Sequence, residues 1–238
     1  MPIKTPKKRT IPVEDKNKRR IKHFANQKET LPIKDPKQIQ QLLEYLINKY
    51  DKAKTEIKRY QADRNYMLIL VGLNTAFRAE DLLQLRVADL NGYIHIKENK
   101  TQKYQNFKMN NELKTAVDNY VKRWNLGRYD YMFMGQKKIV DGKPYIYPIN
   151  RQQGHRIVSQ AGKAIGIDYT FGLHSLRKTF GYIYYANGGD ILTLQKMYNH
   201  DSPETTIRYV HWDTEDVERT RESIFIGLKN KSKSKSKK

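Results

Sequence analysis

The segment Leu173-His174-Ser175-Leu176-Arg177 is followed by His200, 23 residues after the arginine, and by Tyr209 nine residues further on. An arginine can hold a phosphate through two parallel N–H bonds, an imidazole exchanges protons near neutral pH, and a tyrosine oxygen can attack phosphorus. This combination predicts chemistry on a nucleic-acid backbone, in which the tyrosine becomes covalently linked to the strand that breaks.

The charge of the chain indicates a polyanionic partner. Its 238 residues hold 46 Lys and Arg against 25 Asp and Glu, a formal net charge of +21, which is typical of nucleic-acid-binding proteins. Residues 1–30 carry +7 and residues 229–238 carry +6, so residues 31–228 keep +8. Charge alone would fit DNA, RNA or an anionic membrane surface equally well.

Composition divides the chain into three regions. Residues 1–30 and 229–238 are rich in charge and poor in large apolar groups, so we expect basic flexible tails there and one domain over residues 31–228. Cysteine is absent, no His/Asp/Glu grouping has metal-ligand spacing, and we expect neither a metal nor a cofactor. Without a signal peptide or an apolar run of about 18 residues, the sequence predicts a cytoplasmic protein.

Apolar periodicity predicts a mainly α (α+β) body with one small antiparallel sheet. Tyr93, Ile94 and Ile96 alternate with polar residues and are expected in a strand, whose partner returns near 107–109. Asp190 and Ser202 are suited to cap the helices that follow them. The expected helices lie near 36–50, 67–73, 79–86, 111–125 and 151–165, from 174 to the glycines at 188–189, and from 203 past 209.

Four segments together resemble the catalytic domain of the tyrosine recombinase (phage integrase) family. The stretch Asn-Thr-Ala-Phe-Arg-Ala-Glu-Asp-Leu-Leu-Gln-Leu-Arg-Val-Ala-Asp at 74–89 is similar to the first box of that family. His174 to Arg177 matches the second box, and His200 with Tyr209 matches the third. Lys100-Thr101 resembles the family's lysine-bearing hairpin turn. The match covers roughly residues 31–228.

Some positions depart from the family pattern and others support it. Ala76 and Asn199 stand where glycine is usual, and for Asn199 we expect only an altered local turn. Asp81 and Asp89 match the supporting acidic positions of the first box. All six positions expected to carry the chemistry are filled: Arg78, Lys100, His174, Arg177, His200 and Tyr209.

The resemblance implies a site-specific DNA recombinase or integrase that cuts and rejoins strands through a 3′-phosphotyrosyl intermediate, without metal or ATP. It implies that Tyr209 attacks the phosphorus and that Lys100 protonates the departing 5′-oxygen. The two arginines would neutralise the charge of the transition state. The two histidines would manage the tyrosine proton and bond the phosphate.

Alternatives to these roles remain at this stage. Lys103 competes with Lys100 for the role of general acid, and Arg78 could instead cap its helix or pair with Glu80. A non-catalytic DNA-binding regulator would reuse the same basic residues. A type IB topoisomerase shares the tyrosine, arginine and lysine chemistry, but these enzymes generally place a lysine where His174 stands, so the histidine favours recombination.

The expected partners follow from the same resemblance. They are double-stranded DNA, further copies of the chain in a homodimer or homotetramer on DNA, and a possible accessory DNA-bending protein, with no membrane. The gene is expected in a prokaryote, a virus or a mobile element. The helical domain that usually precedes the catalytic one is expected to be missing. An apolar cluster should dock on a neighbouring subunit or, alternatively, fold back on its own domain: Val217, Ile224, Phe225, Ile226 and Leu228.

Overall fold

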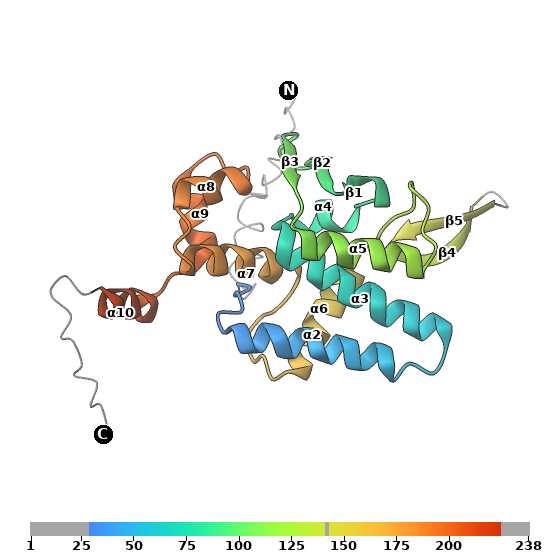
Figure 1. Ribbon diagram of the computed structural model, residues 1–238, viewed down its shortest axis with the longest axis horizontal. Helices are drawn as coiled ribbons and strands as arrows, with labels where there is room; N and C mark the ends of the chain where they lie inside the picture. Colours follow the sequence, from blue (N-terminus) through green and yellow to red (C-terminus); the bar gives the residue numbers. More distant parts are fainter. Residues whose placement is uncertain (1–28, 141–142, 225–238) are drawn as a thin grey trace, which may run out of the picture.

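The computed structural model describes residues 29–140 and 143–224, and within these ranges helices outweigh strands. Two helices, α2 (Pro36–Asp51) and α3 (Glu56–Thr75), lie side by side along one edge of the body (Figure 1). The side chain of Thr55 caps α3 by accepting a hydrogen bond from the backbone N–H of Lys58 at 3.3 Å. The helix expected near 67–73 is therefore about three times longer than its apolar run.

The main core forms where α3 meets the helices around it. Leu42 and Leu46 of α2 and Leu68 of α3 are buried there, as is Leu176 of a later helix. After α3 the chain makes α4 (Ala79–Leu83) and the short 3₁₀ helix η1 (Val87–Asp89), so the helix expected at 79–86 ends earlier. Two more helices complete this part of the body, α5 (Asn111–Arg123) and α6 (Arg151–Ala164).

The expected small sheet is present and antiparallel, with strands in the order β1 (Leu90–Asn91), β2 (Tyr93–Lys97) and β3 (Tyr104–Lys108). Ile94 is fully buried opposite Phe107, and Tyr93 is exposed, so one face of the sheet packs on the core. The return strand starts earlier than predicted, because the ladder continues to the pair Lys97 and Tyr104. The turn between β2 and β3 is correspondingly short.

A second sheet contradicts the expectation of a single one. Strands β4 (Met134–Val140) and β5 (Lys143–Pro148) form a two-stranded hairpin that projects from the body (Figure 1). Tyr145 and Ile146 on it are 47% exposed. The hairpin was missed because its strands pair with each other and bury little, so no alternation of apolar and polar residues marks them.

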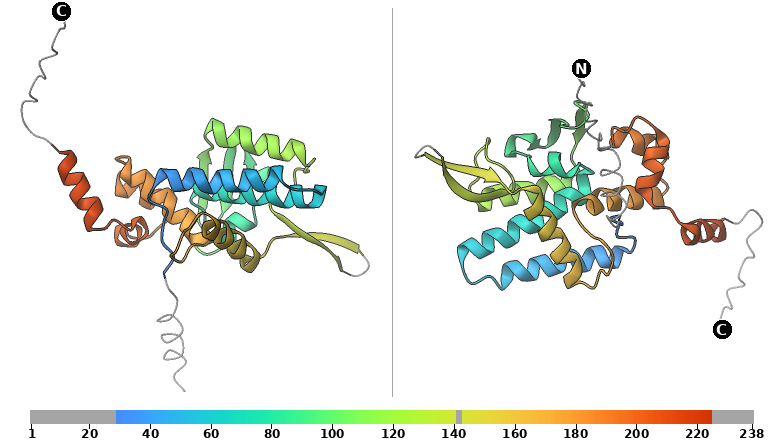
Figure 2. Two further views of the ribbon diagram at one scale, coloured as in Figure 1. Left: turned by 90° about the horizontal axis from the view of Figure 1, so that it is seen from below. Right: turned by 180° about the vertical axis from the view of Figure 1, so that it is seen from behind.

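The C-terminal helices follow the predicted caps. α7 (Leu173–Ala186) ends before the glycine pair, Asp190 caps α8 (Ile191–Met197), and Ser202 caps α9 (Pro203–Val210). The last helix, α10 (Thr214–Ser223), begins after Asp213, because Asp213 and Asp216 form a capping box. It points away from the body (Figure 2). Val217 and Ile224 are exposed; the other members of the apolar cluster, Phe225, Ile226 and Leu228, lie outside the described residues, as do most of the expected tails.

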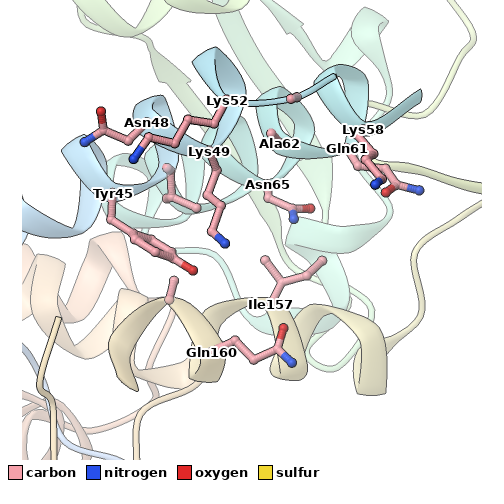
Figure 3. A pocket seen from close by; sticks show the side chains of 13 residues that line it. Tyr45, Asn48, Lys49, Lys52, Lys58, Gln61, Ala62, Asn65, Ile157 and Gln160 are labelled. Atoms are coloured by element: carbon pink, nitrogen blue, oxygen red, sulfur yellow. The ribbon is translucent and has the colours of Figure 1, made fainter. Parts of the chain in front are cut away.

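A cavity of about 700 Å³ opens between α2, α3 and α6 (Figure 3). Lys49, Lys52 and Lys58 line it together with amide side chains such as Asn65 and Gln160. None of the six residues expected to carry chemistry lines this cavity. Within the described ranges, no helix is long and apolar enough to cross a membrane and no group of three His, Cys, Asp or Glu residues could hold a metal ion.

Candidate active site

Arg177 forms the floor of the candidate site. It lies on α7, its residue is 1% exposed, and its Nη1 donates to the carbonyl oxygen of Ala76 at 2.6 Å. Its Nη2 donates to the carbonyl oxygen of Tyr198 at 2.8 Å, and its guanidinium lies 4.3 Å from the centre of the Tyr198 ring. Burial and the neighbouring charge of Arg78 lower the pKa of Arg177 to about 10, so it remains a cation at neutral pH. Its Nε is buried without a hydrogen-bond partner in the described part of the chain.

Arg78 reaches the same place from the junction of α3 and α4. Its Nη2 donates to the carbonyl oxygen of Tyr198 at 3.4 Å, and its Nη1 lies 2.5 Å from Oε2 of Glu98. The alternative partner Glu80 instead faces Arg151 at 3.7 Å. Two guanidinium groups therefore meet at one backbone carbonyl, where their like charges would repel each other without a nearby anion.

Glu98 supplies part of that negative charge and was not among the predicted residues. It is fully buried at the end of β2, accepts from Thr101 Oγ1, and accepts from Gln105 Nε2 at 3.0 Å. Burial alone would raise the pKa of Glu98, but these hydrogen bonds and the charge of Arg78 lower it. In the sequence Glu98 is one acid among several lysines, which is the pattern of a solvated turn, so only the fold reveals its role.

His200 lies between Arg177 and the helix that carries Tyr209. Its Nε2 is 3.2 Å from Arg177 Nη2 and its Nδ1 is 3.0 Å from Thr206 Oγ1. Because a guanidinium N–H can only donate, Nε2 accepts and the ring proton lies on Nδ1, which donates to the Thr206 hydroxyl. Burial, and after it the charges of the two arginines, lower the pKa of His200 to about 4. The ring is neutral at pH 7.

Tyr209 lies on α9 beside these groups. Its ring centre is 5.0 Å from that of His200, and the guanidinium of Arg177 is 5.6 Å from it. The backbone at Asn199 has a φ of 51°, which turns the chain from α8 toward His200. Asparagine tolerates this left-handed conformation better than most residues, so the departure from glycine leaves the turn intact.

His174 lies one helical turn before Arg177, on the same face of α7. Burial, followed by the charges of Arg151, Arg177 and Lys178, lowers the pKa of His174. Within the described ranges it makes no hydrogen bond or ion pair, so its ring nitrogens are available to a ligand.

Lys100 lies apart from the arginines, because within the described ranges no hydrogen bond or ion pair joins it to another predicted residue. It is exposed in the turn between β2 and β3, and among the described residues nothing pairs with it. The base of the turn is anchored, because Asp81 Oδ1 accepts from the backbone N–H of Asn99 at 2.8 Å. The competing Lys103 is occupied differently, since its Nζ lies 2.5 Å from Oδ1 of Asp201.

With this geometry in view, the chain can be compared with known proteins. It matches the phage integrase family over residues 32–216. The chain belongs to the phage integrase family. The family expected from the motifs is confirmed, and with it the enzyme class of tyrosine recombinases.

The relatives and solved structures agree with this assignment. The chain is 34% identical to the Probable integrase/recombinase YoeC of Bacillus subtilis (strain 168), an alignment that covers 83% of this chain and 97% of that protein. It is 27% identical to Tyrosine recombinase XerH of Helicobacter pylori (strain ATCC 700392 / 26695), covering 74% of this chain and 48% of XerH. This chain therefore matches about half the length of XerH.

The crystal structure of XerA recombinase superposes with a TM-score of 0.61 at 22% identity, covering 84% of this chain and 67% of that one. XerH bound to its palindromic difH substrate, in a post-cleavage complex, superposes with the same TM-score and identity over 83% of this chain and 54% of that one. At this identity the superpositions show that the fold is shared.

Proposed function

We propose that this recombinase cleaves one DNA strand by attack of the Tyr209 oxygen on a phosphodiester and later rejoins the strand to another 5′ end. The observation that carries the proposal is the meeting of Arg78 and Arg177 at the carbonyl oxygen of Tyr198, beside the Tyr209 ring. Two cations lie together there, and among residues 29–140 and 143–224 Arg177 Nε has no hydrogen-bond partner, an arrangement that suits a dianionic transition state.

In the first step the Tyr209 oxygen forms a bond to phosphorus while the bond to the 5′-oxygen breaks. The tyrosine proton passes to a neighbouring base. The imidazole of His200 is neutral at pH 7, and its Nε2 takes the proton once Arg177, which donates to it in the free protein, turns that N–H toward the phosphate. Lys100 gives a proton to the departing 5′-oxygen. The reverse reaction uses a 5′-hydroxyl as nucleophile, so the energy of the phosphodiester is kept in the phosphotyrosine and no ATP is consumed.

We propose double-stranded DNA as the partner. The net charge of +21 and the DNA complexes of the solved XerH and Tn1549 transposon integrase support it. We further propose that the chain is monomeric when free and assembles as a dimer or tetramer on its site, with an accessory DNA-bending protein where the DNA must be shaped. The exposed Val217 and Ile224 of the segment that points away from the body support an intermolecular contact.

A suicide DNA substrate tests the proposal. It carries a nick near the scissile phosphate, so that the short fragment diffuses away and the covalent complex accumulates. Wild-type protein should give an adduct that survives denaturant, and digestion should place the DNA on the peptide that contains Tyr209. Tyr209→Phe should bind the same DNA without forming the adduct.

The same assay separates the competing functions. DNA binding without any adduct from the wild-type chain would support a regulator that reuses the fold. Relaxation of supercoiled plasmid without strand exchange between two sites would support topoisomerase activity. An adduct that persists in Tyr209→Phe would overturn the assignment of the nucleophile.

A further inference from the structure

The segment that enters the body, Glu29 to Lys34, lies across α7 and is called here the entry segment. Ile33 within it is fully buried, and its backbone N–H donates to Thr179 Oγ1 at 2.9 Å. The backbone N–H of Leu31 donates to the carbonyl oxygen of Thr170 at 3.2 Å. The entry segment is therefore fixed to α7, the helix that carries Arg177, and to the loop before it.

One end of the entry segment reaches the turn after the nucleophile helix through Lys178. This lysine is 5% exposed, and its Nζ donates to Glu29 Oε1 at 2.7 Å, to the carbonyl oxygen of Thr30 at 2.7 Å, and to His211 Nε2 at 2.6 Å. An ammonium group has three N–H bonds, and all three are used. His211 Nε2 accepts one of them and also lies 3.3 Å from Glu29 Oε1. Burial and the charge of Lys178 lower the pKa of His211, and Glu29 opposes them.

The other end reaches the same turn through Lys34. Its Nζ lies 2.5 Å from Asp213 Oδ2 and 2.6 Å from Asp216 Oδ2. Asp216 is 1% exposed and also accepts from the Tyr182 hydroxyl at 2.7 Å. Burial opposes the charge of Asp216, but the bonds from Lys34 and Tyr182 lower its pKa to about 2. Asp216 and Lys34 are therefore both charged at neutral pH.

These two contacts bracket the chain directly after the proposed nucleophile. His211 follows Tyr209 by two residues and has a φ of 52°, the left-handed conformation that ends α9. Lys178 Nζ also lies 5.7 Å from the centre of the Tyr209 ring. Movement of the turn between α9 and α10 would carry Tyr209 away from Arg177 and His200.

We propose that the entry segment is a clamp that acts within the same chain and sets the position of Tyr209, with Lys178 and Lys34 as its positioning residues. The inference rests on the proposed role of Tyr209 as nucleophile. Glu29, at one end of the clamp, directly follows the first 28 residues of the chain, which are basic.

Two residues of the clamp have exposed or half-exposed side chains, so they can be replaced without unfolding the body. Glu29 has a side chain 67% exposed and Lys34 one 31% exposed, so Glu29→Ala and Lys34→Met should remain folded. Cleavage of saturating suicide substrate in a single turnover should slow about tenfold in each variant, while DNA affinity changes less than twofold. Glu29→Gln keeps an oxygen acceptor at the same reach and should recover most of the rate. Lys114→Met, which breaks an exposed pair with Asp118, serves as the matched control.

Hydrogen exchange of the free protein separates failure of the clamp from failure of the proposed function. Peptides covering 203–216 should exchange faster in Glu29→Ala and Lys34→Met than in the wild type or the control, even if the wild type forms no adduct. Unchanged exchange would overturn the clamp. Faster exchange with unchanged cleavage, or a loss of DNA affinity that matches the loss of rate, would overturn its role in positioning Tyr209.

Discussion

The arginine floor, made of Arg78 and Arg177 with their partners, and the lysine turn between β2 and β3 are proposed to act on the same phosphate, yet the protein holds them in opposite ways. Arg177 is 1% exposed and bonded to two backbone carbonyls. Lys100 is exposed and, within the described ranges, unpaired. Charge that stabilises a transition state is most effective when it is fixed beforehand, whereas a proton donor only has to reach the leaving oxygen once DNA is bound.

The base of the lysine turn nevertheless belongs to the floor. Glu98 at the start of the turn pairs with Arg78. Asp81 in α4 accepts a hydrogen bond from the backbone N–H of Asn99. The turn is thus anchored at its root, and within the described ranges the Lys100 side chain at its tip makes no hydrogen bond or ion pair. A fixed arginine pair and an unpaired lysine are compatible, because only the Lys100 side chain has to lose conformational freedom when substrate binds.

The floor is also where prediction from sequence was strongest. The motifs gave Arg78, Arg177, His200 and Tyr209. In the structure both arginines donate to the Tyr198 carbonyl, His200 contacts Arg177, and the Tyr209 ring lies beside His200. Helix caps such as Ser202 were readable too, because a cap depends on residues close in sequence.

What the sequence could not reveal depends on contacts between distant segments. Glu98 resembles a solvated charge until α3 brings Arg78 against it, and Lys178 resembles a surface lysine until Glu29 and His211 enclose it. The β4–β5 hairpin pairs with itself and buries too little to leave an apolar pattern.

Replacing Arg177 in the arginine floor should have the largest effect on the cleavage rate. Arg177→Lys keeps a cation but loses the planar fork that serves Ala76 and Tyr198 at once. We expect cleavage of the suicide substrate to slow about 10³-fold and stability to fall by roughly 1–3 kcal/mol for a buried carbonyl left without its donor. Single-turnover adduct formation and thermal unfolding measure the two effects.

The exposed Arg59→Lys on α3 is the control for this change. If Arg177→Lys lowered the melting temperature but its folded fraction cleaved at the wild-type rate, the arginine would be structural and the floor would not be catalytic.

Replacing Lys100 should affect the rate and leave stability unchanged, since its side chain is exposed. Loss of a general acid slows reactions by about 10²–10⁴-fold, and we expect Lys100→Ala to fall in that range. A substrate with a 5′-bridging sulfur, which leaves without a proton, should restore the rate. Lys103→Ala, which breaks only the pair with Asp201, should cleave both substrates nearly normally.

If the substrate with the bridging sulfur restored the cleavage rate of Lys103→Ala but not that of Lys100→Ala, Lys103 would be the general acid in place of Lys100. A lower melting temperature for Lys100→Ala would show that the tip of the turn is not free, and the contrast with the floor would weaken.

Acid should destabilise the floor through His200. Its pKa is about 4 in the folded protein against 6.5 for an ordinary histidine. Between these values the unfolded chain binds a proton that the folded chain does not, so the free energy of unfolding falls as the pH drops from about 6.5 to about 4 and is independent of this group above that window. The effect is measured by comparing the melting temperatures of the wild type and His200→Gln over this pH range. Carboxylates titrate in both proteins, so the difference between the two curves reports His200. Parallel curves would contradict a buried, neutral His200.

The smallest effect concerns the turn that delivers the Tyr198 carbonyl and His200 to the arginines. Asn199 between them has a φ of 51° and a long contact of 3.5 Å from its side-chain nitrogen to the carbonyl oxygen of Tyr104. Both Asn199→Gly and Asn199→Ala remove that contact, so their difference isolates the backbone. An alanine in the left-handed region costs about 1–2 kcal/mol, and glycine has no such cost. We expect the alanine variant to melt at a lower temperature than the glycine variant while both cleave DNA at nearly the wild-type rate once folded, because the floor is fixed by hydrogen bonds at either side of the turn. Slower cleavage by the folded alanine variant would show instead that the arginine floor depends on the geometry of this one residue.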